Sequence, residues 1–251
     1  QPHFMVTFAR CLSSRPMIGL IIASVALLMF MQNTASTNQY VFMLYYHDTS
    51  WISVPQLVSY GVQIAMMIFI RPMLKIADKK FWSSVPFIAV IALTIYMIIS
   101  PMSTPLSWVI VSGIIGLLQG AFTLLVWALI SDCIDYMEAK TGRREEGSVY
   151  SCVTLFRKIG SGVGAALLGV AMTWTGYDEN LDALEQAAGV GLNVKNLAAI
   201  YLLVGAVMIA VAMGLVYNLS DKKMAEVEKQ LGRSTDKNAR LDDSLYGSHE
   251  D

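Results

Sequence analysis

The chain has 251 residues, of which 55% are hydrophobic and 15% are charged, and its formal net charge is −1. A net charge this close to zero gives no indication of a nucleic-acid partner. A soluble domain of this length does not carry repeated apolar stretches of about 20 residues, which is what a bilayer core of about 30 Å requires. The composition therefore predicts an all-α integral membrane protein, because helices satisfy their own backbone hydrogen bonds in lipid.

Six apolar stretches are long enough to cross a bilayer, and they cover residues 16–46, 54–74, 82–99, 107–131, 148–174 and 197–217. Lysines and arginines cluster before the first stretch and after the second, fourth and sixth, and they are almost absent from the other connections, where only Lys195 lies nearby. The positive-inside rule therefore predicts that both ends lie in the cytoplasm, and we expect a cell membrane of the bacterial inner-membrane type.

The first predicted span is unusual because a polar run, QNTASTNQ at residues 32–39, interrupts it. One interpretation is a single helix whose polar side chains, Asn33 among them, face protein or a water-filled cavity. The other is a span that ends near Met31 and is followed by an outer loop. The aromatic-rich run at residues 40–46 favours the single helix, because such rings gather at the membrane interface.

Small residues recur at helical spacing in the fourth and fifth spans, where we interpret them as close helix packing and not as ligand contacts. The residues concerned are Gly113, Gly116, Gly120, Gly160, Gly162, Gly164 and Gly169.

The three cysteines, Cys11, Cys133 and Cys152, have no metal-ligand spacing, and we predict that they are small buried residues. The sequence shows no nucleotide-binding glycine loop, metal motif or nucleophile–base pair. We therefore predict neither an enzyme nor a bound cofactor or metal.

The chain divides into a predicted six-helix transmembrane bundle at residues 1–218 and a polar segment at residues 219–251. The run SDKKMAEVEKQL at residues 220–231 predicts a short amphipathic helix on the cytoplasmic surface. Residues 232–251 are polar enough to predict disorder. Because the chain begins at Gln1 and not at a methionine, we expect a fragment or a processed chain.

Charged residues concentrate between the fourth and fifth spans. Asp132 and Asp135 share one helical face, and Lys140, Arg143 and Arg144 follow in a predicted turn. These side chains are either solvated loop charges or an ion-pair network that holds helix ends together in one of two conformations.

Lys158 is the strongest candidate for a functional side chain. Tyr150, Thr154 and Lys158 are spaced i, i+4, i+8, so a helix presents a phenol, a hydroxyl and a cation on one face to a polyhydroxylated ligand. If the span starts near Gly147, Lys158 lies about 16 Å along it, near the midplane. An ammonium there costs about 2.5–3.5 kcal/mol and needs a carboxylate or a cavity. If the apolar run starts at Ile159, Lys158 is a flank that reaches the headgroups. The spacing leaves both interpretations open.

The pattern D-x-x-D-Y from Asp132, the charged turn, and Y-S-x-x-T-x-x-x-K ending at Lys158 precede a Gly/Ala-rich helix. Together they resemble the glycoside–pentoside–hexuronide:cation symporters of the major facilitator superfamily, which include the melibiose carrier. The first span also looks like that family's seventh helix, through Asn33-x-Ala35-Ser36 and Tyr45-Tyr46.

The resemblance covers residues 10–231 and the C-terminal six of the family's twelve helices. It implies the C-terminal half-bundle of a major facilitator fold, in a carrier that moves a sugar or glycoside with Na⁺ or H⁺ by alternating access. It also implies that Lys158, with Thr154 beside it, faces the central cavity and helps couple cation and sugar. The partners would be the lipid bilayer and the N-terminal six-helix half, which would hold most of the cation site.

This chain departs from the family at Thr123, which stands where the tenth helix has an aromatic at the sugar site. Trp127 lies nearby but out of register, and we assign it to packing.

We therefore predict two groups of functional residues. Substrate contact or coupling is assigned to Lys158, Thr154, Tyr150 and Asn33, and a cytoplasmic gate to Asp132, Asp135, Arg143 and Arg144. One alternative is a non-transporting half-size membrane module that acts as an assembly partner or sensor. Another is a carrier of a different amphiphilic solute, such as a lysolipid or a peptide fragment, on the same fold.

Overall fold

The computed structural model describes residues 4–233, apart from the side chains of residues 4, 5, 7, 30, 32 and 33. The disorder predicted for residues 232–251 falls almost entirely outside this range. The described residues form α1 (Phe4–Ser13), α2 (Arg15–Leu44), α3 (Val54–Ile76), α4 (Lys79–Ser84), α5 (Pro86–Ile99), α6 (Pro105–Thr141), α7 (Glu146–Trp174), α8 (Val190–Val211) and α9 (Asp221–Gln230), with a 3-10 turn at Thr49–Trp51 and a π-helical turn at Ala212–Val216.

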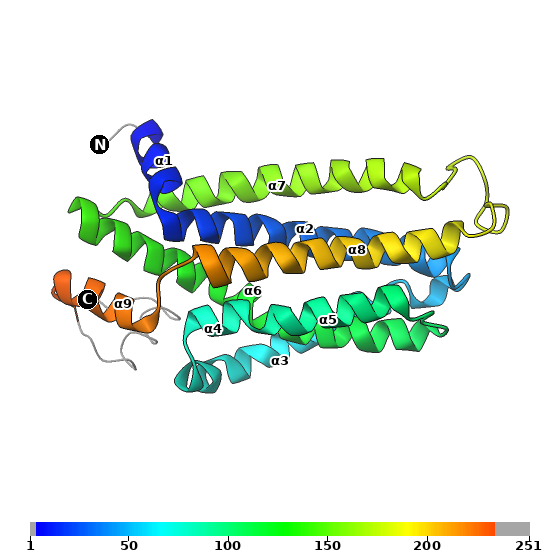
Figure 1. Cartoon of the computed structure of the whole chain (residues 1–251), viewed down its shortest axis with the longest axis horizontal. Coiled ribbons are helices and arrows are strands. Elements are labelled where there is room, and N and C mark those ends of the chain that lie inside the picture. The colour runs from blue at the N-terminus through cyan, green and yellow to red at the C-terminus, as the bar shows by residue number, and fades with distance from the viewer. Residues whose placement is uncertain (1–3, 234–251) are drawn as a thin grey trace.

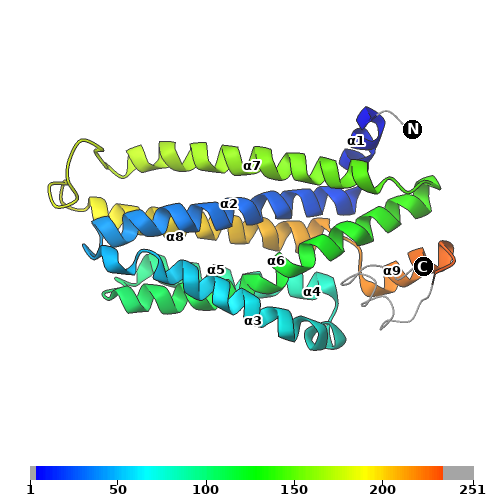
Figure 2. The ribbon, with the colours of Figure 1, turned by 180° about the vertical axis from the view of Figure 1, so that it is seen from behind.

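The long helices run side by side along the long axis of the molecule (Figure 1). The central helix, α2, packs against α7 and α8, while α3 packs against α6 and α5 against α8. Both α1 and α9 lie at one end of the bundle, which we call the α1/α9 end. There α6 and α7 approach each other, and they diverge toward the opposite end (Figure 2).

Six segments of the described chain are long and apolar enough to cross a membrane, as predicted. The third is broken between α4 and α5, because Pro86 has no backbone N–H and starts a new helix. The fourth continues past residue 131 to Thr141 and ends at Gly142, whose φ of 70° is left-handed. Asp132, Asp135 and Lys140 therefore lie on a helix, and the prediction that placed Lys140 in the turn is wrong.

The sixth span begins at Val190, seven residues before the predicted residue 197. Lys195 thus lies inside α8 and not in a loop, and its side chain is only 1% exposed. Its Nζ donates to the carbonyl oxygens of Ser100, at 2.8 Å, and Ile98, at 3.4 Å. These carbonyls belong to the end of α5 and lack helical partners, so the lysine satisfies them.

The first span is a single helix, as predicted, because α2 is unbroken to Leu44. Thr37 and Asn38 of the polar run are buried, and the Trp108 indole donates to Asn38 Oδ1 at 3.0 Å. Ser36 and Gln39 are exposed. Only part of the polar run therefore faces the interior of this bundle.

The packing interpretation of the glycines is confirmed at Gly116 and Gly160. A Cβ at Gly116 would lie 3.2 Å from the Cα of Ser59 on α3, and one at Gly160 would overlap Val25 of α2. By contrast, Gly162 and Gly169 face open space. The three cysteines are free and buried, also as predicted.

Candidate functional site

Lys158 lies well inside a continuous helix. At 1.5 Å per residue it lies about 18 Å from Glu146, the first residue of α7. Lys158 and Thr154 are exposed on the same face, and Tyr150, one turn earlier, is half-buried. Lys158 forms no ion pair within the described residues. The side chain of Asn33 lies outside the described side chains.

An aromatic and cationic cluster joins α6 to α7. The Tyr150 ring stacks on Trp127, with centroids 6.2 Å apart and planes at 28°. The Arg157 guanidinium carbon lies 5.0 Å from the Trp127 centroid. Trp127 is 49% exposed, so packing accounts for only part of its surface. This cluster was not predicted from the sequence, because a contact between two separate helices leaves no signal in residue spacing. The adjacent cations at residues 157 and 158 are the one local feature that indicates it.

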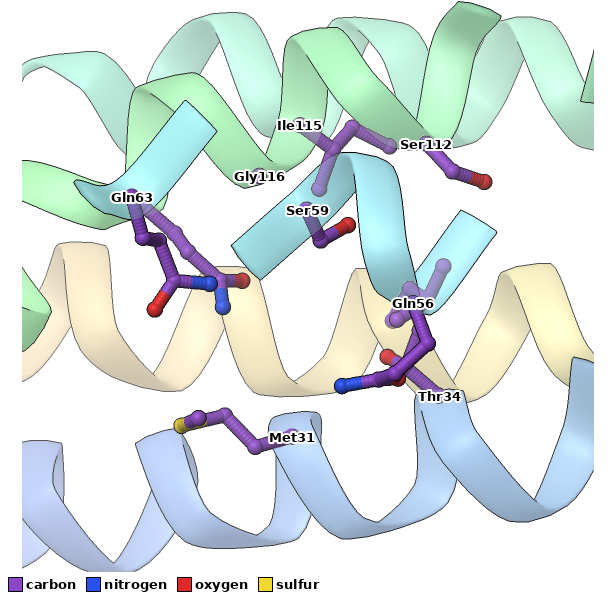
Figure 3. Close-up of a pocket in the computed structure, with 10 residues that line it drawn as sticks. Met31, Thr34, Gln56, Ser59, Gln63, Ser112, Ile115 and Gly116 are labelled. Carbon is purple, nitrogen blue, oxygen red and sulfur yellow. The ribbon is translucent and has the colours of Figure 1, made fainter. Parts of the chain in front are cut away.

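A pocket that several polar side chains line lies between α2, α3, α6 and α8 (Figure 3). Its volume of about 30 Å³ has room for about two water molecules. The Gln119 Oε1 atom is buried and accepts no hydrogen bond from the described residues. The pocket is lined by Met31, Thr34, Gln56, Ser59, Gln63, Ser112, Ile115, Gly116, Gln119 and Leu202.

Three of these polar side chains come from one face of α3. Gln56, Ser59 and Gln63 are spaced i, i+3, i+7, a helical periodicity that could have revealed the pocket from sequence. In the close-up, the Gln56 and Gln63 side chains extend from α3 toward α2 (Figure 3).

Ion pairs connect several elements at the α1/α9 end. Lys79 of α4 lies 2.7 Å from Asp132. Arg144, in the α6–α7 connection, lies 2.6 Å from Asp135 and 2.8 Å from Glu138, and it also pairs with Glu146. Burial alone lowers the pKa of the Arg144 guanidinium, but its hydrogen bonds to these carboxylates raise that pKa above its usual value.

Further arginines extend this cluster to α9 and α1. Arg233, just beyond α9, lies 2.8 Å from Asp135 and 3.0 Å from Glu138. Arg10 of α1 lies 3.1 Å from Glu145.

The structure thus brings together only some of the predicted gate residues. Asp135 and Arg144 form an ion pair, whereas Asp132 pairs with Lys79. The Arg143 side chain is exposed and forms no ion pair within the described residues. The gate itself stays a prediction.

Six membrane-length helical segments of the described chain, with polar side chains held between them, define a multi-pass α-helical membrane protein. Comparison with known families then assigns it. The chain belongs to the family described as MFS/sugar transport protein, which matches residues 1–220. This confirms the family expected from the sequence.

Named relatives include transporters from enteric bacteria. The chain is 38% identical over 113 residues, 45% of its length and 24% of the relative's, to the Escherichia coli "Putative sulfoquinovose importer". It is 37% identical over 107 residues, 43% of its length and 23% of the relative's, to the Salmonella typhimurium "Putative 2,3-dihydroxypropane-1-sulfonate exporter". Over 230 residues it is 24% identical to the Escherichia coli "Glucuronide carrier protein homolog".

The last alignment covers 90% of this chain and 49% of that relative. The chain therefore spans about half the length of this curated relative.

Proposed function

We propose that this chain supplies the C-terminal half of a carrier that moves a sugar or glycoside together with Na⁺ or H⁺ by alternating access. The coupling residues would be Lys158 and Thr154 on α7, with Tyr150 and Asn33 contributing to the substrate cavity. The names of the relatives support this proposal, since two of them are "Putative sulfoquinovose importer" and "Glucuronide carrier protein homolog".

The observation that carries the proposal is Lys158 on the exposed face of α7, which forms no ion pair with any residue that the structure describes. An ammonium about 18 Å along a spanning helix is too costly to leave against lipid. The face of α7 that carries Lys158 must therefore contact protein or water in the complete protein. A second half-bundle with a wet cavity between the halves provides that environment, as in other carriers with binding sites near the midplane.

The two other polar regions fit the same scheme. The pocket lined by Gln56, Gln63 and Gln119 offers amide groups that exchange hydrogen bonds with water or sugar hydroxyls. The ion pairs at the α1/α9 end, among them Asp135–Arg144, provide contacts that can differ between two conformations. We propose this second region as the gate on the cytoplasmic side.

Counterflow in proteoliposomes that contain the complete protein tests the proposal. Sugars and glycosides are screened in Na⁺, Li⁺ and H⁺ gradients, and Lys158→Ala is compared with the unmodified protein. We expect cation-dependent counterflow of at least one sugar, and its loss in Lys158→Ala at unchanged expression. Normal coupled uptake by that variant, or no counterflow with any sugar, would refute the proposal.

A further inference from the structure

The second cation on α7, Arg157, has a setting that differs from that of Lys158. Its guanidinium lies over Trp127 of α6, 5.0 Å from the ring centroid, and that ring also stacks on Tyr150. About half of the Trp127 surface stays exposed. The three side chains therefore form a platform with a cation at one side and an uncovered aromatic surface. We call it the Trp127 platform.

Arg157 has no anionic partner within the described residues. One of its terminal nitrogens, Nη1, is shielded from solvent and donates to no acceptor in the described part of the chain. A cation–π contact compensates only part of the cost of such a charge, since it leaves the N–H groups without oxygen acceptors. An oxygen acceptor that the rest of this chain does not supply is therefore favoured at this position.

The carboxylates of α6, α7 and the connection between them are already engaged. Asp135, Glu138 and Glu146 pair with Arg144, while Glu145 pairs with Arg10. Asp132 is the remaining described carboxylate of α6 and α7, and it pairs with Lys79. The negative charge that complements Arg157 must consequently come from outside the described chain.

We propose that the Trp127 platform is a subsite for the anionic group of an acidic sugar. A guanidinium presents a planar fork of N–H donors that matches a carboxylate or a sulfonate. The exposed indole surface suits the apolar face of a pyranose ring. Arg157 would then select acidic over neutral sugars, while Lys158 keeps its coupling role. This inference rests on the proposed function and adds its substrate class.

Matched sugars that differ only at C6 test the inference in proteoliposomes of the complete protein. The methyl glycoside of glucuronic acid carries a carboxylate there, methyl 6-deoxy-6-sulfoglucoside a sulfonate, and methyl glucoside a hydroxyl. We expect unmodified protein to prefer the two acidic probes. In Arg157→Gln the half-saturating concentration of those probes should rise by about 10- to 100-fold, which is the contribution of hydrogen bonds to a charged group. The half-saturating concentration of methyl glucoside should stay the same.

Two further variants separate a specific role from a structural one. Arg157→Lys keeps the charge but loses the planar fork, so we expect an intermediate effect. Lys75→Gln removes an exposed cation at the end of α3 and should leave all three probes unaffected. The amount of folded protein, read by size-exclusion chromatography, should be equal in each.

The outcomes distinguish this inference from the proposed function. Equal transport of acidic and neutral probes by unmodified protein would overturn the inference and leave sugar transport intact. An equal loss of both kinds of probe in folded Arg157→Gln would overturn it too, because Arg157 would then pair with a carboxylate of the protein. Absence of counterflow with any sugar would refute the proposed function, and the inference with it.

Discussion

Lys79 and Asp132 form a nearly dry ion pair that joins α4 to α6, with Nζ 2.7 Å from Oδ1. Their side chains are only 12% and 9% exposed. The pair joins the short helix α4 to the long helix α6 at the α1/α9 end of the bundle.

Removing one partner of this pair should cost more than removing both. Asp132→Asn leaves the Lys79 ammonium without a counter-charge, and we expect a loss of about 3 kcal/mol in the free energy of unfolding. Lys79→Gln should cost a similar amount, and the double variant less than either single variant. Thermal unfolding of the complete protein in detergent measures all three. Additive effects of the two substitutions would show that the pair is not coupled.

Arg144 and Arg143 are adjacent arginines with different surroundings. Arg144 contacts three carboxylates, whereas Arg143 is exposed and forms no ion pair in the described chain. We expect Arg144→Gln to lower stability by about 1 kcal/mol, since its side chain is partly exposed, and this difference should shrink in 1 M salt. Arg143→Gln is the matched control. The same loss in both variants would contradict the network.

Gly160 and Gly162 offer a paired test of helix packing on the same helix. A methyl group at Gly160 would overlap Val25 of α2, while Gly162 has open space around it. We expect Gly160→Ala to destabilise the protein by about 1–3 kcal/mol through overpacking. Gly162→Ala should be neutral or slightly stabilising, because alanine favours helix. Thermal unfolding of the two variants compares them, and a neutral Gly160→Ala would argue against close α2–α7 packing.

The Cys11 thiol should resist alkylation in the folded protein. Burial raises the pKa of Cys11 to about 12, and the neighbouring Cys152 adds to this effect. The thiol stays protonated from pH 7 to pH 9, so the reactive thiolate is scarce. Maleimide labelling followed by peptide mass spectrometry should detect modification only after denaturation. Lys229→Cys, at an exposed position on α9, serves as the reactive control. Rapid labelling of Cys11 at pH 7 would contradict its burial.

Several features of the fold were predictable because they depend on local chemistry. The six spans follow from apolar length alone, which the bilayer dimension sets. The amphipathic pattern of residues 220–231 predicted the helix that the structure contains as α9. The close approach at Gly160 was predictable from small residues at helical spacing. The extension of α6 to Thr141 was missed, because charged residues end a hydropathy pattern without ending a helix.

The partners of the charged residues were not predictable in the same way. Asp132 was expected near Arg143 and Arg144, but it pairs with Lys79, which is 53 residues away in sequence. Lys195 was counted as a loop charge, yet it is buried against the end of α5. Neither contact has a counterpart in the local sequence pattern.

The sequence alone determined the class of this protein, its number of spans and the helix that carries Lys158. Apolar length and helical period are properties of a single segment, and the bilayer enforces both. Tertiary structure alone decided which face of each helix is covered, which ion pairs form, and that Arg157 lies over Trp127. Those relationships depend on how separate helices approach one another, and the approach is set by side-chain packing across the whole bundle.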